Sequence, residues 1–86
     1  MEVVFKQSAL DDLRKMDGSA KKFFLAHAGK LREIPPRRHM KYGLPYNVER
    51  VTDNARMAYE IESGTLYVVS CFATHKDYER WYRSFR

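Results

Sequence analysis

The sequence is poor in the residues that build covalent or metal-held scaffolds. Its single cysteine, Cys71, excludes an intramolecular disulfide and a cysteine-rich metal motif. Cys71 lies in an apolar run, which favours a buried structural thiol over a nucleophile. The sequence also has no metal-ligand spacing, no glycine loop that would cradle a phosphate and no hydrolase nucleophile elbow. We therefore expect a protein that holds neither a metal ion nor a cofactor.

Long apolar runs are missing as well. No stretch approaches the roughly 20 apolar residues that cross a bilayer, and the N-terminus runs directly into the strand-like Val3-Val4-Phe5 instead of a signal peptide. Internal repeats and low-complexity segments are absent. A chain of 86 residues has room for one core, so we expect a single domain over residues 1–86, in a reducing cytoplasm and away from the membrane.

Positive charge is what the sequence has in excess. Its 16 lysines and arginines outnumber its 11 acidic residues, which gives a net charge of +5. Such a balance indicates a polyanion or an acidic protein as partner, without choosing between them. The densest basic segment could follow a nucleic-acid backbone or receive an acidic protein segment. Its basic residues are Lys30, Arg32, Arg37, Arg38, His39 and Lys41.

The start of the chain predicts a strand followed by a short helix. Residues 2–6 have strand character. Ser8 and Asp11 have the spacing of a capping box, which opens a helix with Leu10 and Leu13 inward. The Asp-Gly pair that follows is expected to end this helix.

A second, longer helix is predicted between Ser19, which can cap it, and Pro35-Pro36, which stops it. We interpret His27 on its apolar face as a packed core histidine. The apolar positions have the spacing of an amphipathic stripe and comprise Ala20, Phe23, Phe24, His27, Ala28, Leu31 and Ile34.

Three strands and a helix are predicted for the second half of the chain. Strand-like runs cover residues 46–52, 55–62 and 65–73. Asp53-Asn54 and Ser63-Gly64 separate them as plausible two-residue hairpin turns.

The last segment, residues 76–85, predicts a helix that Thr74 and Asp77 can cap. Its aromatic stripe is typical of a core, although a tyrosine flanked by arginines can also stack on an unpaired base. The resulting order is β-α-α-β-β-β-α, an α+β fold with an antiparallel sheet packed against two N-terminal helices plus a C-terminal helix. The aromatic stripe consists of Tyr78, Trp81, Tyr82 and Phe85.

Turn length predicts which side chains share a face of this sheet. A two-residue loop at Asp53-Asn54 pairs Thr52 with Ala55 and places Glu49 opposite Ala58. One face then carries Asn47, Glu49, Arg56 and Glu60, and the other, core-directed face carries Tyr46, Val48, Met57, Tyr59 and Ile61.

The same pairing through the second turn places Arg56 opposite Cys71 and brings His75 toward the Arg56 face. Glu49, Arg56 and His75 are therefore expected to converge on the solvent face of the sheet. A one-residue slip at the first turn would exchange Glu49 for Arg50.

These three residues are suited to cleaving RNA through the ribose 2′-hydroxyl. That reaction needs a base, an acid for the leaving oxygen and positive charge on the phosphate. Glu49 or His75 could be the base, His75 could be the acid, and Arg56 can hold phosphate through two N–H groups. A plain cross-strand ion pair between Glu49 and Arg56 is the alternative interpretation.

Two segments carry a family resemblance. Residues 48–59 form an arginine-bearing strand, a turn, then Arg followed by two apolar residues and Tyr. Residues 74–79 read Thr-His-Lys-Asp-Tyr-Glu, which is similar to the Thr-His-x-Glu-Tyr-Asp segment of the HigB branch. With the predicted order of elements, these features resemble the RelE/ParE toxin superfamily over nearly the whole chain.

The resemblance implies catalytic residues by position. Arg56 matches the family's phosphate-binding arginine. Lys76 falls where RelE proper has a second catalytic arginine, and Tyr82 falls where it has a catalytic tyrosine. His75 lies near the C-terminal histidine that the HigB and YoeB branches use.

The chain also departs from RelE proper on the strand before the first turn. RelE proper carries two lysines there, whereas this sequence has Asn47 and Glu49. Arg50 is closer to the YoeB pattern. The general base is therefore open between Glu49 and His75.

The resemblance implies the toxin of a type II toxin-antitoxin system, a metal-independent, ribosome-dependent endoribonuclease (mRNA interferase) that a cognate antitoxin neutralises. Further RNA contacts are expected from Arg50, Lys41, Arg37 and Arg38. Two alternatives stay open. One is a ParE-like toxin that binds a protein such as gyrase, and the other is a degenerate member that only binds its partner.

Overall fold

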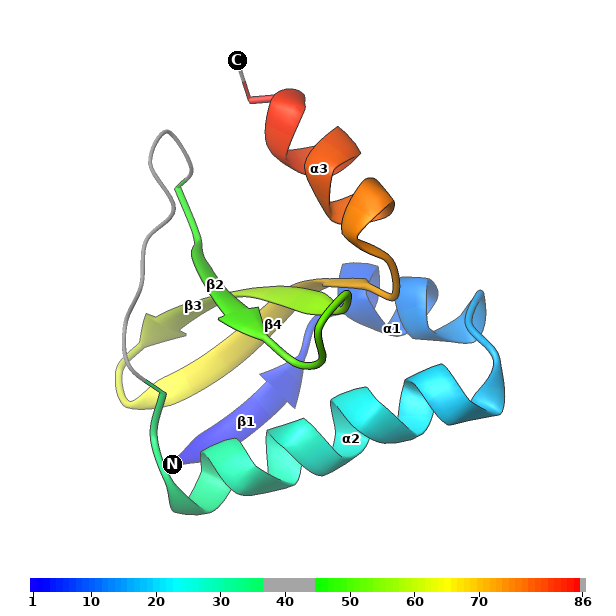
Figure 1. Cartoon of the computed structure of the whole chain (residues 1–86). Coiled ribbons are helices and arrows are strands. Elements are labelled where there is room, and N and C mark those ends of the chain that lie inside the picture. Colours follow the sequence, from blue (N-terminus) through cyan, green and yellow to red (C-terminus); the bar gives the residue numbers. More distant parts are fainter. Residues whose placement is uncertain (37–44, 86) are drawn as a thin grey trace.

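The computed structural model describes residues 1–36 and 45–85, and its elements follow the predicted order. Figure 1 shows the sheet in the middle of the molecule, with α1 and α2 along one face and α3 rising from the end of β4. The α+β fold with the order β-α-α-β-β-β-α is therefore confirmed. The elements are β1 (Glu2–Phe5), α1 (Gln7–Arg14), α2 (Gly18–Glu33), β2 (Asn47–Arg50), β3 (Arg56–Glu62), β4 (Thr65–Phe72) and α3 (His75–Arg83).

The four strands form one sheet in the order β1-β4-β3-β2. β2, β3 and β4 are antiparallel neighbours, as the hairpins predict, while β1 lies parallel to β4. The prediction of an antiparallel sheet is thus correct for three strands and wrong for β1. No hairpin joins β1 to β4, because both helices intervene, so turn geometry does not impose antiparallel pairing there.

The main core fills the space between the sheet and the helices α1 and α2. Tyr59, Met57, Leu66 and Val68 of the sheet and Phe24 of α2 are fully buried in it. Burying an apolar side chain of this size contributes about 1.5–3 kcal/mol, so this layer is the main source of stability. The cluster is completed by Val3, Ala9, Leu13, Ala28, Leu31, Ala55 and Cys71.

Fewer apolar residues of the two helices are buried in this core than the sequence predicts. In α1, Ala9 and Leu13 face inward at the i, i+4 spacing, whereas Leu10 is exposed. Phe23 of α2 and Ile34, which directly follows α2, belong to the predicted stripe and are also exposed. No helix within residues 1–36 and 45–85 is long and apolar enough to span a membrane.

Capping residues set the starts of α2 and α3. Asp17 caps α2, because its carboxylate accepts a hydrogen bond from the Ala20 N–H at 2.9 Å. The predicted cap, Ser19, is already inside the helix. Thr74 caps α3 as predicted, with its hydroxyl accepting from the Asp77 N–H at 3.1 Å.

Ser8 does not cap α1, which begins after Lys6 without a side-chain cap. Its hydroxyl instead donates to the Val69 carbonyl of β4 at 2.5 Å. A second bond runs from the Cys71 N–H to the Asp12 carboxylate at 3.0 Å. The polar side chains of α1 therefore dock the helix on β4.

A second, smaller apolar cluster lies on the opposite face of the sheet, beneath α3. Tyr46 and Val48 belong to it, so their predicted place on the face of the main core is wrong. Ala58, Phe72 and Tyr78 are buried in this cluster, and Tyr46, Val48 and Trp81 pack against them.

Candidate active site on the sheet and the C-terminal helix

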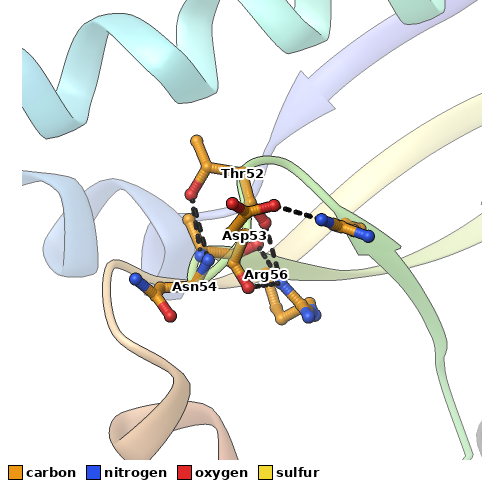
Figure 2. Close-up of polar contacts among 6 residues, drawn as sticks. Thr52, Asp53, Asn54 and Arg56 are labelled. Carbon is orange, nitrogen blue, oxygen red and sulfur yellow. Dashed lines mark hydrogen bonds and ion pairs between the residues drawn. The ribbon is translucent and has the colours of Figure 1, made fainter.

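The connection between β2 and β3 decides which side chains share the face of Arg56. It contains three residues, Thr52–Asn54, and the Val51 N–H donates to the Ala55 carbonyl at 3.0 Å to close it. The Thr52 hydroxyl accepts from the N–H groups of Asn54 at 3.3 Å and Ala55 at 3.0 Å, as Figure 2 shows. These hydroxyl bonds stabilise a turn one residue longer than the predicted one.

The longer turn shifts the pairing of β2 with β3 by one residue, so the predicted register is wrong. Arg50 pairs with Arg56, and Glu49 pairs with Met57. Because a one-residue slip turns every side chain of a strand to the other face, Arg50 joins Arg56 while Glu49 faces the main core. There, Oε1 of Glu49 lies 3.7 Å from Nε2 of His27 on α2. The structure therefore does not bring Glu49 to Arg56.

The pairing of β3 with β4 also departs from the prediction. The Ser63-Gly64 turn forms as predicted, but the register shifts by one residue midway along β3. Arg56 is therefore paired with Phe72 and not with Cys71. Cys71 faces the main core, where burial raises the pKa of its thiol to about 12. Its interpretation as a buried structural thiol is confirmed.

Arg56 is held by the turn that precedes it. Its Nη1 donates to the carbonyls of Thr52 at 2.9 Å, Asp53 at 3.1 Å and Ala55 at 2.9 Å. Figure 2 shows this guanidinium lying against the turn. Among the described residues, none accepts a hydrogen bond from Nη2 or Nε. The guanidinium is thus oriented by one nitrogen and keeps donors for a ligand.

Arg50 stands beside Arg56 but is held differently. Its Nη2 contacts the Asp53 carboxylate. The side chain of Arg50 is 66% exposed and that of Asp53 is 88% exposed. An exposed ion pair of this kind contributes little to stability. Two arginines at paired positions of neighbouring strands repel each other, and an anion bound between them would relieve that repulsion.

One face of α3 carries three rings at i, i+3 and i+7 spacing. The ring centroids of His75 and Tyr78 are 5.7 Å apart, and those of Tyr78 and Tyr82 are 6.3 Å apart. Nε2 of His75 also lies 3.0 Å from Oε1 of Glu79, one turn along the helix. Arg83 contacts the same carboxylate at 3.3 Å.

Tyr78 connects this helix face to Arg56. It is 7% exposed and packs against Phe72, the strand partner of Arg56, with centroids 5.9 Å apart. Burial raises the pKa of the Tyr78 phenol, the Arg56 guanidinium lowers it, and Tyr82 raises it. The structure therefore brings Arg56, His75 and Tyr82 around Tyr78.

Tyr78 was predicted as a core residue and not as part of the site. Its position three residues after His75 and four before Tyr82 was the available signal, because such residues share a helix face. Glu79, which contacts His75, was missed in the same way.

The structure places Lys76 on a different side of α3 from Tyr78. It lines a shallow hollow of about 210 Å³ with Glu79, Arg80 and Arg83. Arg37, Arg38 and Lys41, the other predicted RNA contacts, lie outside the described residues.

A larger hollow of about 760 Å³ lies where α3 faces α1 and the start of α2. Asp12, Asp17 and Asp77 line it together with Arg80 and Trp81. None of the predicted catalytic residues lines it. In residues 1–36 and 45–85, no three His, Cys, Asp or Glu side chains are grouped so that they could hold a metal ion. The candidate site is therefore the surface around Arg56, Tyr78 and the exposed side of α3.

No family model matches the sequence of this chain, and no curated protein matches it. Solved structures do match. A double arginine-to-alanine mutant of the E. coli toxin RelE in the free state superposes with a TM-score of 0.70 at 14% identity, over 95% of this chain and 90% of that one.

Two further structures match at 20% identity. A chain of the toxin-antitoxin complex RelBE2 from Mycobacterium tuberculosis has a TM-score of 0.68 and covers 81% of this chain and 93% of that one. The YoeB/ParE toxin from Agrobacterium tumefaciens has a TM-score of 0.62, with 83% and 95% covered. The chain therefore has the RelE-like fold that the sequence resemblance implies.

Proposed function

We propose that this chain is the toxin of a type II toxin-antitoxin system and cleaves messenger RNA on the ribosome without a metal ion. The observation that carries the proposal is the placement of Arg56. Three turn carbonyls orient its guanidinium beside Tyr78, and His75 and Tyr82 flank that ring on α3. A fixed cation next to groups that exchange protons is what cleavage through a ribose 2′-hydroxyl requires.

The proposed reaction is an internal transfer at one phosphate. The 2′-oxygen loses its proton to a base and attacks phosphorus, the bond from phosphorus to the 5′-oxygen breaks, and an acid protonates that oxygen. The products are a 2′,3′-cyclic phosphate and a 5′-hydroxyl. Arg56, with Arg50 at the paired strand position, would balance the charge on the phosphate oxygens.

His75 is our candidate for the base. Glu49, the other candidate, faces the main core beside His27 and not the Arg56 face. His75 lies at the exposed start of α3, and an imidazole is the side chain that most often acts as a general base in proteins. With His75 as the base, we assign the role of acid to Tyr82, which falls where the family resemblance implies a catalytic tyrosine.

The net charge of +5 supports both proposed partners. Phosphates attract such a surface, and an antitoxin with an acidic segment would compete for it. The RelBE2 structure is a toxin-antitoxin complex on the same fold, which supports a cognate antitoxin for this chain. A reducing cytoplasm, where ribosomes work, is the proposed location.

The test is inducible expression, with and without the neighbouring gene, followed by mapping of transcript ends. We expect growth arrest and cuts inside codons for the wild-type chain, and neither for Arg56→Ala combined with Tyr82→Phe. Arg14→Ala is the matched control, because it removes an exposed arginine of α1 far from the site. Cleavage that survives the double substitution contradicts the proposal. Arrest with DNA damage and intact transcripts would indicate the gyrase-directed alternative, and harmless expression would indicate a degenerate member.

A further inference from the structure

The aromatic ring of Tyr78 contacts residues of both α3 and the sheet in the candidate site. Along α3 it lies between the rings of His75 and Tyr82, with centroids at 5.7 Å and 6.3 Å and the ring planes tilted. Toward the sheet it meets Phe72 at 5.9 Å. Each of these contacts comes from a residue that is either a proposed catalytic group or the strand partner of Arg56.

Tyr78 is buried, whereas His75 beside it on the helix face is exposed. It is 7% exposed and belongs to the buried cluster beneath α3, where Trp81 also packs at 6.3 Å. The side chain of His75, in contrast, is 47% exposed, and its polar partner Glu79 lies on the same helix. Among the described residues, the contacts of His75 lie within α3, so its imidazole would follow any rotation of that helix relative to the sheet. The ring of Tyr78 contacts both His75 and Phe72, and so connects the imidazole directly to β4.

The charges around Tyr78 fit a structural role for its phenol. The Arg56 guanidinium favours the ionised phenol, but burial opposes it more strongly, and the net effect raises the pKa of Tyr78. The phenol therefore stays neutral at physiological pH. A neutral buried ring beside a cation can hold its neighbours without competing with phosphate for Arg56.

From this geometry we infer that Tyr78 is a positioning residue whose ring holds His75 and Tyr82 in place against Arg56. The inference rests on the proposed RNA cleavage and deepens it, since it names a residue that acts through two others. A displacement of about 1 Å at a reacting group can lower a rate about a hundredfold, so loss of the ring should affect turnover far more than RNA binding.

The test compares two substitutions by single-turnover and steady-state cleavage of ribosome-bound mRNA. Tyr78→Phe keeps the ring, and we expect its kcat to stay within about threefold of wild type. Tyr78→Leu keeps an apolar side chain but removes the ring, and we expect kcat to fall about a hundredfold with KM within about twofold. The matched controls are Tyr67→Phe and Tyr67→Leu, because Tyr67 lies on β4 beside Lys6, outside the site.

A second measurement does not depend on cleavage. The side-chain NMR signals of His75 and Tyr82 should carry ring-current shifts that Tyr78→Phe retains and Tyr78→Leu loses. Should leucine release α3 from the sheet, Tyr78→Met supplies a longer apolar side chain for the same comparison.

Three results would overturn the inference. They are wild-type turnover in Tyr78→Leu, equal losses in Tyr78→Phe and Tyr78→Leu, and His75 signals that do not respond to loss of the ring. Equal losses would assign the effect to the hydroxyl and not to the ring. A wild-type protein that does not cleave RNA would instead overturn the proposed function, and the inference with it.

Discussion

The two faces of the sheet are built differently. The face toward α1 and α2 holds a buried cluster that runs from Val3 to Cys71 and includes the five largest fully buried side chains. Within the described part of the chain, the cluster on the face toward α3 has only Ala58, Phe72 and Tyr78 as buried members. One face therefore provides stability, while the other supports a single helix over the candidate site.

This difference places the candidate chemistry on the weakly packed side. Arg56 and Arg50 emerge on the α3 face, and the proposed proton-transfer groups lie on α3 itself. Local stability varies across a protein, and lightly packed elements open at lower free energy than the core does. We therefore expect substitutions on the face toward α1 and α2 to lower mainly stability, and substitutions on the face toward α3 to lower mainly activity.

The largest expected effect on folding is at Phe24. Phe24→Ala removes a fully buried ring from the main core and should lower the free energy of unfolding by about 3–5 kcal/mol. Trp81→Ala, on the partly exposed α3 side, should lower it by about 1–2 kcal/mol while weakening protection of α3 amides. Urea unfolding and amide hydrogen exchange measure both. Equal losses of stability for the two variants would contradict the comparison.

The two arginines of the α3 face should differ in their effect on cleavage. Arg56→Ala removes a guanidinium that three carbonyls hold in place, and kcat should fall about a hundredfold. Arg50→Ala removes an exposed side chain whose partner is the exposed Asp53 carboxylate, and kcat/KM should fall about fivefold through weaker phosphate binding. The measurement is cleavage of ribosome-bound mRNA at two salt concentrations. A larger loss for Arg50 than for Arg56 would show that anchoring by the turn is unimportant.

The two hairpins show what the sequence could predict and what it could not. Ser63 and Gly64 both have positive φ, of 50° and 80°, and the two-residue turn follows from the Ser-Gly pair. The other turn is longer because the Thr52 hydroxyl accepts hydrogen bonds from two N–H groups. The Asp-Asn pair alone does not distinguish this three-residue turn from a two-residue one. Arg56 was predicted on the correct strand. The charged residue of β2 on the same face was predicted to be Glu49 but is Arg50.

The register of β3 with β4 and the role of Tyr78 were also not predicted, and both involve contacts between segments far apart in the sequence. The register shift in β3–β4 lies where the hydroxyl of Ser8 on α1 meets the Val69 carbonyl. Because this contact joins residues 61 positions apart, no local sequence pattern predicts it. Tyr78 was likewise read as an ordinary core aromatic, because its link to Arg56 exists only once α3 packs on Phe72.

The two helix caps provide a smaller test of the same comparison. Asp17→Ala and Thr74→Ala each remove one side-chain acceptor from a helix start, which costs about 1 kcal/mol. We expect Asp17→Ala to lower global stability, because α2 belongs to the main core. Thr74→Ala should mainly fray the start of α3 and slow cleavage, because His75 is the first residue of that helix. Circular dichroism during urea unfolding and amide exchange in α3 distinguish the two outcomes.

The smallest expected effect concerns Asp12, which ties α1 to β4 through the Cys71 N–H. Burial raises the pKa of this carboxyl in the folded chain. The folded state therefore binds the proton more tightly than the unfolded state, so this group's contribution to stability is lost as the pH rises through its folded pKa. Asp12→Asn keeps an acceptor for the Cys71 N–H without the charge, whereas Asp12→Ala loses the bond at a cost of about 1 kcal/mol. Urea unfolding from pH 3 to pH 7 should show wild type losing stability relative to Asp12→Asn as the pH increases, and the opposite trend would mean that the Asp12 charge stabilises the fold.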